Sequence, residues 1–79
     1  MPRFYFDLWE GLEFVEDDVG LDHLSLDAAM RGAVRALGEI VAEDLTLDLN
    51  SKELSIRIRN EAGHVLVDVS IQFSMQQPA

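Results

Sequence analysis

Apolar and polar residues alternate in four stretches of the chain, two near its start and two near its end. In the first stretch, Phe4, Phe6 and Leu8 alternate with more polar neighbours, and the same two-residue period returns around Ile56 and Val67. Successive side chains of a strand point to opposite faces, so this period indicates strands with one buried face. We predict strands over residues 3–9, 12–16, 53–59 and 64–74.

A different period occupies the middle of the chain. Apolar residues recur there at steps of three and four, which at 100° per residue places them on one stripe of a helix. Ser25 precedes this segment and is a good N-cap, because its hydroxyl can accept a hydrogen bond from a free amide of the first turn. We therefore predict a helix over residues 26–43. Its apolar stripe comprises Leu26, Ala29, Met30, Ala33, Val34, Leu37, Ile40 and Val41.

The order of the predicted elements is ββαββ, in a single domain that spans residues 1–79. A sheet with one apolar face and a helix with one apolar stripe bury both surfaces by packing together. We therefore expect an α+β fold in which a four-stranded antiparallel sheet carries the helix on one face. The first and last strands hold the most apolar and aromatic residues, so we place them in the centre. The strands 12–16 and 53–59 then become charged edges.

The helix and the sheet are expected to share one core. Residues 45–51 are predicted to form a loop with buried leucines, a short strand being the alternative, and residues 75–79 a frayed tail. Gly20 and Gly63 fall at turns that need a positive φ. The expected core consists of Phe4, Phe6, Leu8, Met30, Val34, Leu37, Val41, Ile56, Ile58, Val67, Val69 and Ile71.

Composition and charge narrow the classes of function. The chain has 79 residues, no cysteine and a formal net charge of -9 at pH 7. Such an acidic protein lacks a basic face to neutralise phosphates, so neither nucleic acid nor an anionic membrane is an expected partner. No apolar run reaches the roughly 18–20 residues of a membrane span, and the N-terminus lacks the pattern of a signal peptide. Together with the lack of cysteine, this leads us to expect a cytoplasmic protein.

The sequence contains no recognisable motif for nucleophilic, metal or phosphate chemistry. We therefore expect a protein that is not an enzyme and that has no catalytic residues, no cofactor and no metal site. His23 and His64 could meet in a zinc site only with a carboxylate as a third ligand. Two exposed imidazoles in loops are the alternative, and it is the one we favour.

Five short segments share their residues and spacing with a known family. They are the opening Met-Pro-Arg-Phe-Tyr-Phe-Asp-Leu, Asp17-Asp18-Val19-Gly20, Leu26-Asp27-Ala28-Ala29, Arg35-Ala36-Leu37 and Asn60-Glu61-Ala62-Gly63. In these segments the chain resembles the small bacterial domains of unknown function that begin MPRYFF, over nearly its whole length. The resemblance implies a short cytoplasmic protein and brings no catalytic residue, ligand or partner. Relatives often carry an aspartate and a basic residue where this chain has Asn60 and His64, so no common site is implied there.

The densest acidic cluster lies within residues 10–23. Glu16, Asp17, Asp18 and Asp22 could supply several oxygens, which a calcium or magnesium ion requires. The spacing of an EF-hand loop is missing, because Gly20 follows only two adjacent aspartates. Two interpretations stay open. The protein is a small acidic regulator or ligand-binding module that binds a cation or a basic partner here, or the segment is a solvated turn.

The sheet face away from the helix carries more aromatic residues than a solvated face needs. Tryptophan, tyrosine and arginine dominate the energetics of protein interfaces. We therefore expect a non-enzymatic interaction or self-assembly domain that uses this face or an edge strand, as a twofold homodimer or with another protein. In the alternative, Trp9 folds over the sheet edge and Tyr5 flanks a network of salt bridges. Asp7 and Asp68 of the same face could form a buried pair for acid–base chemistry, but we favour solvated salt bridges for both. The candidate interface residues are Tyr5, Trp9, Arg57, Arg59, Leu66 and Asp68.

Overall fold

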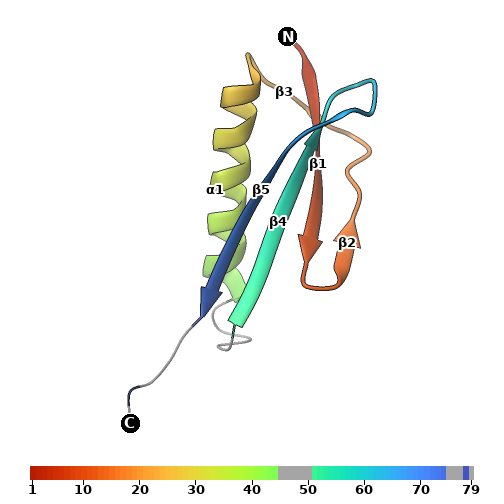
Figure 1. Cartoon of the computed structure of the whole chain (residues 1–79). Helices are drawn as coiled ribbons and strands as arrows, with labels where there is room; N and C mark the ends of the chain where they lie inside the picture. The colour runs from red at the N-terminus through yellow and green to blue at the C-terminus, as the bar shows by residue number, and fades with distance from the viewer. Residues whose placement is uncertain (45–50, 75–77, 79) are drawn as a thin grey trace.

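The computed structural model describes residues 1–44, 51–74 and 78, and the structural statements below refer to these residues. Its elements are β1 (Arg3–Glu10), β2 (Glu13–Val15), β3 (Leu21–Asp22), α1 (Leu26–Asp44), β4 (Ser51–Arg59) and β5 (Val65–Ser74) (Figure 1). The predicted loop at 45–51 lies outside the described residues apart from Ser51, which begins β4. Of the predicted tail at 75–79, only Pro78 is described.

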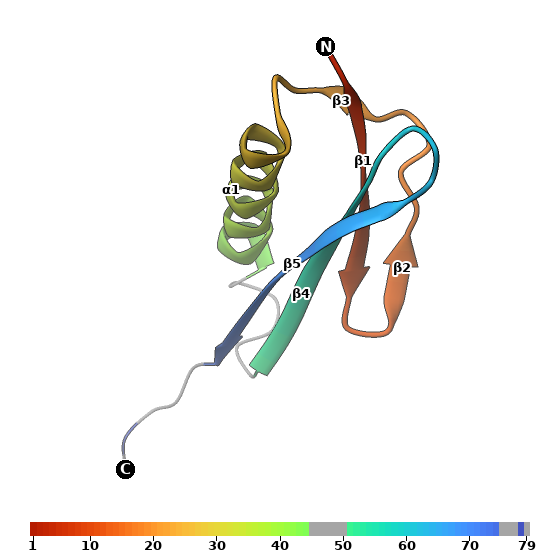
Figure 2. The same cartoon turned by 45° about the horizontal axis from the view of Figure 1, so that its top comes forward.

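The strands form one antiparallel sheet with α1 on one face. β1 pairs with β2 and with β4, and β5 pairs with β4, which gives the order β2-β1-β4-β5. Figures 1 and 2 show α1 on one side of the sheet, and no described helix lies on the other side. The predicted α+β fold and its ββαββ order are confirmed, apart from the added strand β3. This strand pairs with β1, and its two residues are too few for a periodic pattern.

The predicted positions of the last two strands in the sheet were wrong. β4 lies in the centre, between β1 and β5, and β5 is an edge strand. The arginines of β4 led to the prediction that it is a charged edge strand. Each of them instead pairs with a carboxylate of a neighbouring strand. Arg57 pairs with Asp68 of β5, and Arg59 pairs with Asp7 of β1. A central strand can carry cations when the strands on both sides supply the opposite charges.

The core lies between α1 and the sheet. Its most buried members are Phe4, Ala29, Ala33, Leu37, Leu54, Ile56 and Ile58. Two residues of the expected core lie largely outside it, since Val34 is 59% exposed and Ile71 is 37% exposed. Val34 lies about 100° around the helix from Ala33 and so points along the sheet rather than into it. Ile71 belongs to the edge strand β5, which has a neighbouring strand on one side only.

The turns and the helix cap follow the predicted chemistry. The Ser25 hydroxyl accepts a hydrogen bond from the Ala28 N–H at 3.2 Å, which caps the first turn of α1. Gly20 and Gly63 have φ values of 77° and 86°, in the left-handed region that other residues rarely adopt. Gly63 ends the turn between β4 and β5, and a bulge follows where the register of the two strands shifts beside Arg59.

Candidate functional site

The face of the sheet opposite α1, called the outer face below, is organised in rows that run across the strands. Residues that lie directly opposite one another form the rows Phe14–Trp9–Ser55–Ser70, Asp7–Arg57–Asp68 and Tyr5–Arg59. Five of the six candidate interface residues therefore share this face. The sixth, Leu66, lies at the bulge, between the residues of β5 that pair with Ile58 and Arg59.

The first row presents an aromatic pair to solvent. Trp9 and Phe14 are in contact, with their ring centroids 4.5 Å apart and their planes inclined at 38°. The two residues remain 40% and 46% exposed. Beyond Trp9 the row continues with Ser55 and Ser70, whose side chains are small. Phe14 was not among the predicted interface residues, because its place beside Trp9 depends on the register of β1 and β2.

The four charged side chains at the centre of the outer face neutralise one another. Arg57 Nε donates to Asp68 Oδ1 at 2.9 Å, in a pair that is about half exposed. Arg59 donates to the Asp7 carboxylate from Nε at 2.6 Å and from Nη2 at 3.0 Å. Two carboxylates and two guanidinium groups leave no net charge here, although the whole chain carries -9.

Asp7 was expected in a solvated network, and it is instead 3% exposed. Its carboxylate also accepts the Asp17 N–H at 3.0 Å, so the loop after β2 covers it. Arg59 donates to the Asp17 carbonyl at 3.0 Å and lies over the Tyr5 ring, 5.2 Å from its centroid. The hydrogen bonds from Arg59 hold the pKa of Asp7 below its usual range, against burial, which acts in the opposite direction. The pair thus ties the loop to β1 and β4.

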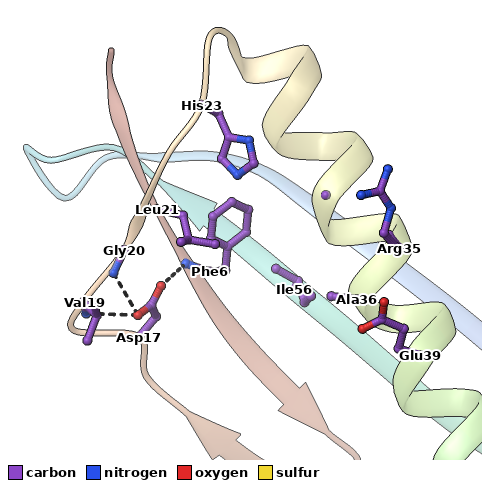
Figure 3. A pocket seen from close by; sticks show the side chains of 11 residues that line it. Phe6, Asp17, Val19, Gly20, Leu21, His23, Arg35, Ala36, Glu39 and Ile56 are labelled. Carbon is purple, nitrogen blue, oxygen red and sulfur yellow. Dashed lines mark hydrogen bonds between the residues drawn. The ribbon is translucent and has the colours of Figure 1, made fainter.

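The Asp17 carboxylate accepts a hydrogen bond from β1 at a point where β1 has neither β2 nor β3 beside it. β1 pairs with β3 near its start and with β2 near its end, and Phe6 lies between these two ladders. The Asp17 carboxylate accepts hydrogen bonds from the N–H groups of Phe6, Val19 and Gly20, each at 3.0 Å (Figure 3). Burial would raise the pKa of Asp17, but these three bonds, together with Arg59, hold it below its usual range.

We expect acid to weaken the fold through Asp7. Folding lowers the pKa of this carboxyl, so its contribution to stability is complete above the unfolded pKa of about 3.9 and is lost as the pH falls through the folded value. The variant Asp7→Asn lacks this contribution at every pH. Thermal melting should show a difference in Tm between the two proteins that is constant above about pH 5 and shrinks below about pH 4. A difference that does not change with pH would contradict an ionised Asp7.

A groove of about 540 Å³ lies on the α1 side of the sheet, between α1 and the segment that precedes it (Figure 3). Phe6, Ile56 and Leu21 give it a mostly apolar lining, and Arg35 and Glu39 stand on its α1 side. His23, expected as an exposed loop residue, is only partly exposed and lines the groove. Its ring packs edge-on against Phe6, with centroids 5.6 Å apart. His64 is exposed, as expected.

The acidic segment is used largely for contacts within the chain. Asp17 binds backbone amides, Asp22 pairs with Arg3 at 3.1 Å, and a Glu16 oxygen lies 3.9 Å from Arg59. Within the described ranges, no group of three or more His, Cys, Asp or Glu side chains is placed to hold a metal ion. The geometry of these residues therefore gives the cation-binding interpretation no support.

Comparison with known proteins identifies a family. Residues 3–72 match a family model described as "Domain of unknown function (DUF6894)". No curated protein and no solved structure matches the chain. The predicted resemblance to small domains of unknown function is confirmed at this level. The match begins at residue 3, so it does not test the opening motif. In the described part of the chain, α1 is not long and apolar enough to cross a membrane.

Proposed function

The chain belongs to the family described as "Domain of unknown function (DUF6894)", and we infer its function from its own surface. We propose that it is a non-enzymatic interaction and self-assembly domain that associates through the outer face. The observation that carries the proposal is the exposed Trp9–Phe14 pair, which lies beside two ion pairs whose four charges sum to zero. A twofold homodimer is the simplest assembly, and another protein is the second kind of partner.

The two ion pairs of the outer face support association between acidic copies. Two chains of net charge -9 repel each other over distances up to about 10 Å at ordinary salt. On the outer face, Arg57 and Arg59 balance Asp68 and Asp7, so these four side chains add no net charge to the contact, and Glu16 lies at their margin, near Arg59. Aromatic residues with internally paired charges are typical of protein interfaces, whereas a nucleic acid would require excess positive charge.

The first row is also suited to a contact between identical surfaces. Large side chains occupy one half of it, Phe14 and Trp9, and small ones the other, Ser55 and Ser70. In a twofold contact each surface meets its own copy in reverse, so the aromatic half of one row can cover the serine half of the other. Covering the two rings buries apolar area that a chain of 79 residues otherwise leaves in water.

The double variant Trp9→Ser/Phe14→Ser tests the proposal. Interface aromatics commonly contribute 2 kcal/mol or more, so the dissociation constant should rise by about 30-fold or more. Sedimentation equilibrium measures the constant, and circular dichroism checks that the variant is folded. The control is Val19→Ser/Leu24→Ser, which removes two exposed apolar residues before α1 and should leave association unchanged. A parent that stays monomeric at millimolar concentration would refute self-association, and a folded double variant that associates like the parent would refute the outer face.

A cytoplasmic location and the lack of a resident cofactor belong to the same proposal. They are supported by the absence of cysteine from the whole sequence and by the lack of a recognisable catalytic motif in it.

A further inference from the structure

β5 is a long sheet edge with little protection among the described residues. It has ten residues, VLVDVSIQFS, with no proline, no lysine and one charged residue, Asp68, which already pairs with Arg57. The other edge consists of β2 and β3, which have three and two residues. The free N–H and C=O groups of a long edge pair readily with another strand, and natural sheets usually shield them with charges, proline or a covering segment.

We propose that β5 pairs antiparallel with β5 of a second copy, about a twofold axis that runs through Ser70 perpendicular to the sheet. The two sheets then become one continuous sheet, with both copies of α1 on the same side. This contact uses an edge of the sheet and is separate from the outer face, so it goes beyond the function proposed above.

The neighbouring flank of α1 fits such an arrangement. α1 packs on both β4 and β5, and neighbouring strands lie about 4.8 Å apart. A twofold axis beside β5 therefore places the two α1 axes about 10 Å apart, an ordinary distance for packed helices. Gly32 and Ala36 line the groove on the β1 side of α1, and Val34 lies about 200° around the helix from each of them, on the flank toward β5. Ile71 lies in the edge strand β5. Both Val34 and Ile71 are exposed apolar residues that the second copy would cover.

The residue through which the twofold axis passes follows from the alternation of side chains along β5. Residues opposite each other must point to the same face, so a twofold axis passes through one residue of the strand. An axis at Asp68 would set two carboxylates against each other. An axis at Ser70 sets Asp68 against Gln72 of the second copy, whose amide can donate to it, and Val69 against Ile71. It also uses the regular part of β5, which begins at Val67, after the bulge.

Single cysteines test the pairing directly, because the natural chain contains none. Under mild oxidation with diamide, Ser70→Cys should form a disulfide-linked dimer at least about tenfold faster than the controls, since the axis brings its two sulfurs within bonding range. Ser55→Cys is the first control, because it lies directly opposite Ser70 on the central strand. Gln72→Cys is the second, because it lies on the same edge and face but about 13 Å along the strand from its own copy.

The cysteine series is repeated in the Trp9→Ser/Phe14→Ser background, where the outer-face contact is removed and the β5 result should be unchanged. Rapid linkage of Ser70→Cys in both backgrounds supports the pairing, even if the outer-face proposal fails. Linkage no faster than that of Ser55→Cys refutes the pairing, and fastest linkage at Gln72→Cys refutes the axis at Ser70.

A charge introduced at Val34, on the flank of α1 next to β5, tests the proposed pairing independently of the cysteines. In the Trp9→Ser/Phe14→Ser background, Val34→Glu should raise the dissociation constant of the β5-paired dimer about tenfold or more, because two carboxylates would meet beside the axis. Ala42→Glu adds the same charge at an exposed position on the solvent side of α1 and should leave the constant unchanged. Equal constants for the two variants would overturn the arrangement of the helices.

Discussion

Replacing Leu37 by alanine is expected to lower the free energy of unfolding by about 2–5 kcal/mol, because the change removes buried methyl groups and leaves a cavity. Leu37 is 2% exposed and lies at the centre of the contact between α1 and the sheet. Small domains are stable by only about 5–15 kcal/mol, so this loss would remove a large part of the stability of a domain near the lower end of that range. Urea titration followed by circular dichroism measures the change.

Val34→Ala is the matched control for this prediction. It shortens another apolar side chain of the same helix, and both residues were expected in the core, yet Val34 is largely exposed. Its replacement should change the stability of the monomer little, measured at a concentration too low for self-association. If Leu37→Ala unfolded at the same urea concentration as the parent, α1 would not pack on the sheet as described.

The second large effect is expected at Asp7. The change Asp7→Asn should lower the free energy of unfolding by about 3 kcal/mol at neutral pH, since breaking a buried ion pair leaves its other member without a counter-charge. We expect the lower part of the range known for such pairs, because Arg59 keeps the Asp17 carbonyl and lies near Glu16. Chemical denaturation at pH 7 measures the loss.

Asp68→Asn makes the same chemical change in the other ion pair of the outer face. The pair of Asp68 with Arg57 is about half exposed, and exposed pairs contribute little because water and salt screen them. Asp68→Asn should therefore lower the free energy of unfolding much less than Asp7→Asn does. Equal losses for the two variants would mean that the burial of Asp7 does not set its contribution.

The periodicity of apolar residues predicted the helix and, apart from β3, the strands, but it did not predict which strands lie side by side. The helix stripe and the alternating strands are local patterns, and Ser25, Gly20 and Gly63 act through their own backbone or that of near neighbours. The place of a strand in a sheet depends on charges that meet across strands. Arg57 and Arg59 look like residues of an exposed edge until Asp68 and Asp7 are known to lie beside them.

In the candidate site, too, features that depend on one strand were predictable and features that depend on contacts between segments were not. Alternation was enough to place Tyr5 and Trp9 on the outer face, because it needs only the strand itself. It could not place Phe14 against Trp9, since that contact depends on the register of the hairpin. The burial of Asp7 depends on a loop that comes ten residues later, and no local pattern links the two.

A carboxylate, and not a partner strand, completes the β1 edge at Phe6. A partner strand restricts insertions, because one added residue turns every later side chain to the opposite face. Asp17 holds β1 at one residue only, but the same carboxylate accepts the N–H groups of Val19 and Gly20, so an insertion between Asp17 and Gly20 would break two of its three hydrogen bonds. Because Asp17 and Gly20 also line the groove, one carboxylate fixes both the edge of β1 and the wall of the groove, and a change of Asp17 would alter the two together.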